Sequence, residues 1–278
     1  MRDFLARALR HRSFVAGGLL TLLMLGMAAL SLLWTPYNPT AINIRRRLGP
    51  PSAENWLGTD AFGRDVFSML LVGAQNSIIV GVLAVGIGAS IGTALGLWAS
   101  ARRGWVEEGV MRAADFTFAF PAVLSAIMFA AVLGPQSLNS IIAISIFNIP
   151  IFARVARGSA NAIWARDFIL AARACGKGAL RITIEHVLPN ILAVLVVQAT
   201  IQFALAILAE AALSYLGLGT QPPTPSWGRM LNEAQALIFR APLLVVFPGI
   251  AIMLSVLGLN LLGDGLRDLT DPRLSRQR

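Results

Sequence analysis

The sequence is poor in charge. Charged residues make up 13% of its 278 residues, whereas a soluble domain carries about 25%. Hydrophobic residues make up 56%, and the mean hydropathy is +0.69. Several apolar runs approach the roughly 20 residues that cross a bilayer. This composition excludes an ordinary soluble domain and predicts an all-α integral membrane protein.

Residues that bind metals or form disulfides are also scarce. Cys175 is the single cysteine, so no intrachain disulfide can form. The two histidines, His11 and His186, lie far apart without zinc spacing. The sequence therefore predicts neither a metal site nor an intramembrane enzyme. It contains no long basic tract, so the net charge of +9 predicts no nucleic-acid partner.

Six apolar runs are candidates for membrane-spanning helices, because a helix satisfies its own backbone in lipid. They cover residues 15–34, 76–101, 113–134, 138–153, 189–216 and 241–263. The first run is longer than the roughly 7–15 apolar residues of a signal peptide, so we expect a retained anchor. The fourth is short and is expected to extend into flanking polar residues.

The basic residues predict the orientation of these spans. Of the 23 lysines and arginines, 17 lie in the segments on one side of six spans, and six lie on the other. The basic-rich segments are 1–14, 102–112, 154–188 and 264–278. Positive charge favours the cytoplasmic side. Both termini and the segment 154–188 are therefore predicted to be cytoplasmic.

Small residues and prolines predict how some of the spans pack and bend. Gly88, Gly92 and Gly96 form two overlapping G-x-x-x-G steps. Such a face allows another helix to approach closely. Whether that helix belongs to this chain or to another subunit stays open here. Pro121 and Pro248 are expected to begin or kink helices.

The segment 170–190, LAARACGKGALRITIEHVLPN, differs from its apolar surroundings. It is not a phosphate-binding P-loop, because Ala171 and Gly178 stand where that motif needs a glycine and a hydroxyl. Its spacing predicts two short amphipathic helices joined by a glycine elbow. The second helix would place Leu180, Ile184 and Val187 on one face. A helix in the lipid interface and a helix in a partner's groove remain equally open.

An ion pair and a proline are also predicted to shape the end of this segment. Arg181 and Glu185 are expected to form an ion pair at i,i+4. Pro189 suits the first turn of the next span.

Elsewhere, Asp115 is expected to pair with Arg112 near the cytoplasmic start of the third span.

The segment 171–190 resembles the EAA loop of bacterial ABC-importer permeases, a coupling helix that sits on the ATPase subunit. NWLGTDAFGRDVFSMLLVGAQNSI, AEAALSYLGLGTQPPTPSWGRML and FPGIAIMLSVLGLNLLGDGLRDLTDPR follow the pattern of one subfamily. Together they resemble, over essentially the whole chain, the C-type permease of the dipeptide/oligopeptide/nickel importers.

The resemblance implies the type I ABC importer (MetI-like) fold, with six transmembrane helices and both termini cytoplasmic. Residues 1–75 would form the N-terminal tail, first span and periplasmic loop. Residues 76–267 would form the permease core, with coupling helices at 164–187. Residues 268–278 would form a cytoplasmic tail.

The resemblance also implies a non-enzymatic permease in the bacterial inner membrane that forms half of a peptide pathway. Nickel chelates, glutathione or opine-like solutes are alternative cargoes. The implied partners are a B-type permease, a periplasmic substrate-binding protein and two ATP-binding subunits, which would bind ATP and Mg. A self-contained secondary transporter is an alternative of a different class, but such proteins usually show internal repeats, which are not clear here.

Candidate site residues fall into three groups. The ATPase-coupling residues are Leu170, Ala171, Ala172, Gly176, Lys177, Arg181, Leu188 and Pro189. Candidate pathway residues are Asn148, Gln198, Gln202 and Glu210. The alternative is interhelical hydrogen bonding for the three amides and pairing within the subunit interface for Glu210. Candidate periplasmic docking residues, for which a self-packed cap is the alternative, are Asp60, Arg64, Asp65, Trp227 and Arg229. Leu170 replaces the glutamate that names the motif, so its salt bridge would be absent.

Overall fold

A computed structural model describes residues 8–270 of the chain, and most of these residues are helical. Their extended pairing is limited to an isolated bridge between Thr59 and Asp65. The elements are α2 (Arg12–Leu33), η1 (Ile44–Arg46), α3 (Val66–Arg102), α4 (Gly104–Ala119), α5 (Ala122–Leu133), α6 (Ser137–Trp164), α7 (Asp167–Ala174), α8 (Ala179–Ile182), η2 (Thr183–Val187), α9 (Leu188–Tyr215), α10 (Trp227–Ala234), η3 (Gln235–Leu237) and α11 (Leu243–Thr270).

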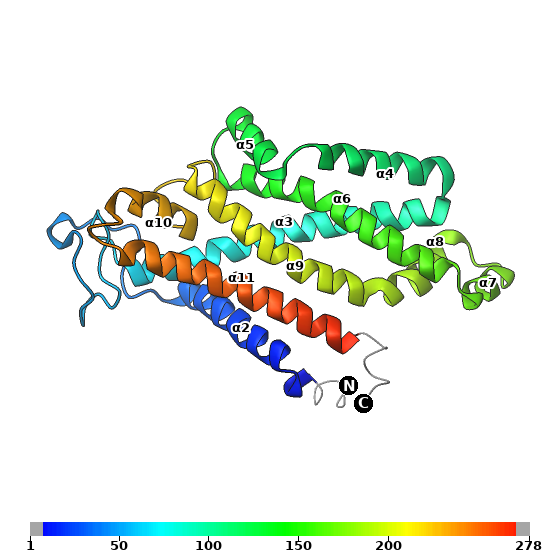
Figure 1. The fold of residues 1–278 in the computed structure, drawn as a ribbon, viewed down its shortest axis with the longest axis horizontal. Helices are drawn as coiled ribbons and strands as arrows, with labels where there is room; N and C mark the ends of the chain where they lie inside the picture. The colour runs from blue at the N-terminus through cyan, green and yellow to red at the C-terminus, as the bar shows by residue number, and fades with distance from the viewer. Residues whose placement is uncertain (1–7, 271–278) are drawn as a thin grey trace.

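The long helices lie side by side along the length of the molecule (Figure 1). The start of α2, the α3–α4 turn, α7, α8 and the end of α11 lie at one end, here called the α7 end. The loop after α2 and helix α10 lie at the opposite end, the α10 end. Successive spans therefore alternate in direction, which agrees with the predicted clustering of the basic segments on one side.

Five described helices are long and apolar enough to cross a membrane, and a bent pair, α4 and α5, supplies a sixth. The apolar run 113–134 is not one straight helix, because α4 and α5 are bent by 87°, and the expectation that Pro121 begins or kinks a helix is confirmed. Phe120 has extended backbone angles and Pro121 precedes α5. A residue before proline disfavours the helical conformation, and proline cannot donate the next hydrogen bond.

Several observed boundaries lie outside the apolar runs. Helix α6 extends past 153 to Trp164, as expected for the short fourth run. Helix α3 begins at Val66, so the domain boundary drawn at residue 75 falls inside this helix. The predicted tail 268–278 begins within α11, and its last eight residues, like residues 1–7, lie outside the described part of the chain.

Two hydrophobic cores lie next to each other and share α3 and α9. One core joins α3 and α6 to the segment 164–187, through residues such as Phe152, Trp164 and Ile169. The other joins α2, α10 and α11 to α3 and α9 and includes Trp227. The first core therefore connects the membrane helices directly to the segment 164–187, which the sequence predicts to be cytoplasmic.

The glycine steps of α3 pack inside the chain against α6. A Cβ at Gly88 would overlap Asn148, one at Gly92 would overlap the carbonyl of Ile149, and one at Gly96 would overlap the carbonyl of Ala153. The predicted close helix approach is thus confirmed, and the approaching helix belongs to this subunit. This contact fixes α6, which leads directly into α7.

Replacing Gly92 by alanine should destabilise the chain by about 1–3 kcal/mol, because the added methyl group would push α3 away from α6. Gly86 is a matched control on the same helix, since nothing lies within 4 Å of a Cβ added there. Gly86→Ala should be neutral or stabilising by up to about 1 kcal/mol. The measurement is the thermal midpoint of each variant in detergent. Equal midpoints would contradict the close approach.

Candidate functional site

Helix α7 is a short helix held against the end of α6 by a few contacts. Ile169 is fully buried in the core that includes Trp164. The Arg173 guanidinium lies 5.1 Å from the centre of the Trp164 ring, within the range of a cation–π contact. The rest of α7 is largely exposed. The helix is therefore anchored on one face and free to contact a partner on the other.

The predicted glycine elbow is present and has the geometry of a Schellman motif. The N–H of Lys177 donates to the Ala172 carbonyl at 3.1 Å, and the N–H of Gly176 donates to the Arg173 carbonyl at 2.9 Å. Gly176 has φ +80°, a conformation that costs other residues more than glycine. The four-residue spacing between Ala172 and Gly176 is therefore the spacing that closes this helix end.

The segment after the elbow is not the separate short helix that the sequence predicts. Helix α8 passes through η2, a five-residue π-helix, into α9, so the helix is continuous from Ala179 to Tyr215. The predicted apolar face is also wrong in part, because Leu180 and Ile184 are exposed whereas Val187 is buried. The wider turn of a π-helix changes the spacing that the sequence pattern assumes.

Exposed apolar side chains gather on α7 and on the segment that follows the elbow. We call this set the apolar tip: Phe168, Leu170, Leu180 and Ile184. Leu180 is 75% exposed and Leu170 is 57% exposed. Both α7 and α8 project at the α7 end, beyond the ends of α2 and α11 (Figure 1). Apolar side chains exposed at such a position are typical of an interaction site.

Ion pairs connect the elbow to the start of α9. The Lys177 Nζ lies 2.6 Å from Glu185 Oε2, and the predicted Arg181–Glu185 pair is present at 2.6 Å. Lys177 Nζ also lies 3.0 Å from His186 Nε2, and the His186 ring meets the Phe168 ring edge-on. Both oxygens of one carboxylate are therefore engaged by cations on either side of Gly178.

The remaining predicted coupling residues lie on α7 and at the start of α9. Ala171 is exposed and Ala172 is partly buried on α7. Leu188 and Pro189 form the first turn of α9, as predicted for Pro189. Six of the eight predicted residues thus lie on α7, at the elbow or on α8, whereas Leu188 and Pro189 lie farther along the continuous helix. Their role in binding a partner stays a prediction.

At the α10 end, charged residues form a buried network between the loop after α2 and helix α10. Arg64 Nε donates to Asp60 Oδ2 at 2.6 Å, and the Arg64 guanidinium also pairs with Glu233. Glu233 in turn accepts from Arg229 Nε at 2.9 Å. Burial lowers the pKa of Arg64, but the hydrogen bonds and charges of Asp60 and Glu233 raise it above its ordinary value.

The other two residues of the predicted docking set are also engaged within the chain. Asp65 caps α3 by accepting from the Ser68 N–H at 2.8 Å, and it accepts from Asn55 Nδ2 at 2.8 Å. Trp227 is 1% exposed, and its Nε1 donates to the Leu70 carbonyl at 3.1 Å. These contacts describe a self-packed cap, and docking through these residues stays a prediction.

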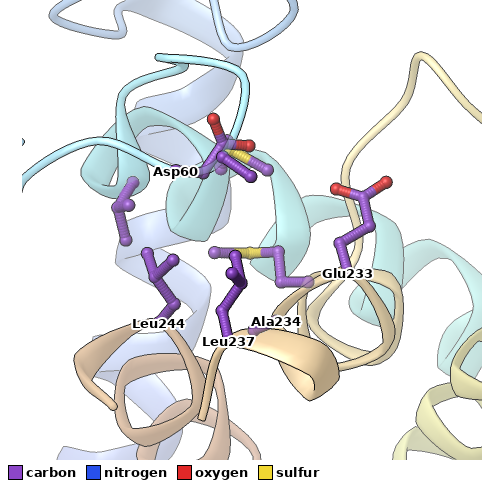
Figure 2. Close-up of a pocket in the computed structure, with 9 residues that line it drawn as sticks. Asp60, Glu233, Ala234, Leu237 and Leu244 are labelled. Carbon is purple, nitrogen blue, oxygen red and sulfur yellow. The ribbon is translucent and has the colours of Figure 1, made fainter. Parts of the chain in front are cut away.

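A small cavity lies beneath this cap. Figure 2 shows Asp60 and Glu233 at its polar side and Leu237 and Leu244 at its apolar side. Its volume of about 20 Å³ suits about one water molecule and is far below that of a small-molecule site. The cavity therefore belongs to the packing of the cap. Glu233 was missed in the sequence, although its i,i+4 spacing from Arg229 could have indicated it.

Glu210 is the one carboxyl group among the four pathway candidates, and its residue is 1% exposed. Its carboxylate accepts hydrogen bonds from the hydroxyls of Ser77 at 3.2 Å, Ser214 at 2.7 Å and Thr220 at 3.4 Å. These partners come from α3, from α9 and from the loop after α9. Glu210 therefore joins three segments of its own subunit near the α10 end.

The three amide side chains of the pathway set are placed differently. Asn148 is buried against Gly88, and its Nδ2 donates to the Ile144 carbonyl at 3.0 Å. Gln202 is buried and Gln198 is half-buried on α9. Neither of the two described cavities is lined by any of the four pathway candidates. A pathway role for any of the four stays a prediction.

Helix α4 is tied to α6 by ion pairs that the sequence analysis assigned incorrectly or missed. Asp115 pairs with Arg154 of α6 and not with Arg112, which pairs instead with Glu108 one turn earlier. The expected Asp115–Arg112 pair is absent for two reasons. Arg112 pairs with Glu108 at i,i+4, which is better placed than Asp115 at i,i+3. Asp115 meets a basic residue of the facing helix α6 instead. Asp115 lies in the second half of α4, away from the α3–α4 turn.

An apolar groove of about 460 Å³ lies between α4 and the pair α3 and α6. Trp98, Trp105 and Pro150 are among its lining residues, which carry no charge. At its edge, Arg157 Nε donates to Glu107 Oε1 at 2.5 Å. The lining suits a lipid chain or another helix better than a charged solute.

Residues 92–276 match the model of a family described as binding-protein-dependent transport system inner membrane component. The chain is also 42% identical, over 98% of its length and 91% of the relative, to the glutathione transport system permease protein GsiD of Pectobacterium atrosepticum. It is 48% identical, over 84% of its length and 76% of the relative, to the dipeptide transport system permease protein DppC of Alkalihalophilus pseudofirmus.

The fold is similar to that of a chain in the inward-facing MetNI methionine ABC transporter. The TM-score is 0.60, and the likeness covers 73% of this chain and 97% of that one. The two share 19% sequence identity, so the likeness concerns the fold. It agrees with the predicted MetI-like arrangement.

Replacing Arg64 by methionine should lower stability by about 3–5 kcal/mol, because Asp60 and Glu233 would keep largely buried charges without their shared cation. Arg46→Met is the matched control. Arg46 forms an exposed ion pair with Glu54 at 2.8 Å, and its loss should cost below about 1 kcal/mol. Thermal midpoints in detergent and the rate of proteolysis in residues 34–65 measure both. Similar effects of the two variants would rule out a special role for the buried network.

Proposed function

The chain belongs to the family of binding-protein-dependent transport system inner membrane components and is a permease subunit of an ABC importer, and from this premise we propose how it couples and what it carries. We propose that the apolar tip docks on a cytoplasmic ATP-binding subunit. ATP and Mg would be bound by that partner, and this subunit would perform no hydrolysis itself. The α7 end would then face the cytoplasm of a bacterium whose inner membrane holds the protein.

The observation that carries this proposal is the apolar tip. Phe168, Leu170, Leu180 and Ile184 are exposed at the end of the molecule toward which the basic segments cluster. Side chains beyond the spans have no hydrocarbon to cover them, so their burial against a protein would be favourable. Charged residues beside them, the exposed Arg166 and Asp167 among them, would supply the polar rim of such an interface.

We propose that a second, B-type permease completes the translocation pathway and that two ATP-binding subunits drive it. Within this subunit, the described cavities are a small one under the cap and an apolar groove beside α4. The first is too small for a peptide, and the second is large enough but lacks the charged groups expected of a peptide site. A pathway formed between two permease subunits accounts for this better than a pathway within one.

The proposed cargo is a short peptide delivered by a periplasmic substrate-binding protein. Relatives similar over 84–98% of this chain are named for dipeptide and glutathione transport. Glutathione is itself a tripeptide, so both names indicate small solutes with an amine and carboxylates. Nickel chelates and opine-like solutes remain alternatives to be compared in the same assay.

Reconstitution tests this function. The chain is co-expressed with a candidate second permease, ATP-binding subunits and binding protein from the same organism, and the purified complex is placed in liposomes. ATP-dependent uptake of a labelled dipeptide, glutathione and a nickel–histidine chelate is compared. Uptake that needs ATP and the binding protein supports the proposal. Ion-driven uptake by the chain alone would favour a secondary transporter instead.

Substituting both Phe168 and Leu180 with serine should reduce retention of the ATP-binding subunits during purification by about tenfold or more, because each apolar anchor of an interface contributes on the order of 1 kcal/mol. Phe239→Ser is a matched control, since Phe239 is fully exposed at the opposite, α10 end. Subunit retention is measured by quantitative gel analysis. Equal retention by the two variants would contradict docking through the apolar tip.

Replacing Gly176 by valine should impair coupling, because a β-branched residue is strained at φ +80°. The strain would cost on the order of 1–2 kcal/mol and distort the elbow. Gly178→Val is the control, because Gly178 has φ −70° and, like Gly176, has nothing within 4 Å of an added Cβ. Transport by the reconstituted complex should fall more for Gly176→Val. The reverse order would exclude conformational strain as the reason for a glycine here.

A further inference from the structure

The backbone of the elbow between α7 and α8 is flexible, so further contacts are needed to hold the two helices in one orientation. Gly176 and Gly178 flank a single residue, Lys177, and neither glycine has an atom within 4 Å of the position of a Cβ. Glycines give the backbone more conformational freedom than other residues do. The Schellman hydrogen bonds end α7, but they do not tie it to the helix that follows. A displacement of α7 could therefore be absorbed at this joint.

Glu185 joins the two sides of this joint. One of its oxygens lies 2.6 Å from Lys177 Nζ, which belongs to the elbow, and the other lies 2.6 Å from Arg181 Nε on α8. Lys177 also reaches His186 at 3.0 Å, and the His186 ring meets Phe168 of α7. We call Lys177, Arg181, Glu185 and His186 the elbow clasp.

The position of the clasp connects it to a membrane span. Glu185 and His186 lie in η2, which continues without a break into α9. The Nδ2 of Asn190, in the first turn of α9, donates to the His186 carbonyl at 2.6 Å. A force applied to α7 can thus reach α9 through side chains as well as through the two glycines.

The clasp also bears on the absence of a carboxylate at position 170. Leu170 is an exposed apolar residue, so α7 cannot use this position to pair with a basic group. Glu185 instead supplies a carboxylate to the basic residues of the elbow from within the chain. The contact at Leu170 would then be apolar, and the charged contact of the loop would be internal.

We infer that Glu185 is a positioning residue, which locks α7 to α9 so that movement of the docked ATP-binding subunit reaches the membrane spans. This inference rests on the proposed docking of α7. Glu185 does not itself need to touch the partner. Its loss would leave the ATP-binding subunits bound and hydrolysing ATP, whereas less of each hydrolysis cycle would appear as transport.

Glu185→Gln in the reconstituted complex tests the inference, with glutathione and a labelled dipeptide as the transported probes. Transport per ATP hydrolysed should fall by about threefold, the size of effect that a solvent-accessible ion-pair network supports. Retention of the ATP-binding subunits should not change. Lys177→Gln breaks the same clasp from its other side and should act alike, and Glu185→Asp should restore part of the loss.

Glu108→Gln is the matched control. Glu108 and Arg112 form an exposed i,i+4 pair at 2.6 Å on α4, the same kind of pair as Glu185 and Arg181. Its removal should leave transport per ATP unchanged. The lone cysteine, Cys175, lies exposed at the elbow. A spin label there should become more mobile in Glu185→Gln than in Glu108→Gln, in the full-length chain in detergent.

The possible outcomes separate this inference from the proposed function. Wild-type coupling in both Glu185→Gln and Lys177→Gln would overturn the clasp. Loss of the ATP-binding subunits from Glu185→Gln would also overturn it, because Glu185 would then act in docking. Failure of the wild-type chain to retain ATP-binding subunits would instead refute the proposed function, whatever the variants do.

Discussion

The close contact between α3 and α6 is the constraint on which the rest of the structure depends. Three glycines on one face of α3 let the backbones approach until a methyl group would not fit. In lipid, moving an apolar side chain from the acyl chains to a helix interface gives no hydrophobic stabilisation. Close packing of this kind is therefore what stabilises helix association there. Because α6 ends at Trp164, against which α7 packs, this contact also determines where the apolar tip lies.

Charge is used differently at the two ends of the molecule. At the α10 end, Arg64 is largely buried between carboxylates, and its network closes a cap. At the α7 end, the charges around Glu185 are accessible to solvent, and apolar side chains lie exposed beside them. The first arrangement favours a fixed structure. The second is suited to a surface that meets another protein and transmits its movement.

The sequence predicted the spans, their direction and the glycine elbow, because each depends on local composition or on a residue with special backbone properties. It predicted a break at Pro121 but not the angle of the bend, since apolar content says nothing about the direction of a chain after a break. It misplaced the face containing Leu180 because a π-helix changes the helical period. The partners of Arg64 and Asp115 were missed because Glu233 and Arg154 lie far away in sequence and meet them only in three dimensions.

The unbroken helix from Ala179 to Tyr215 has a mechanical consequence. Its 37 residues span about 55 Å at 1.5 Å per residue, which is longer than the hydrocarbon layer of about 30 Å. The helix is therefore long enough to extend beyond the hydrocarbon layer at the elbow. Pivoted at its Ala179 end, a tilt of about 5° would displace its other end by about 5 Å. A small change of angle at the elbow would thus become a displacement of several ångströms at the α10 end of the molecule.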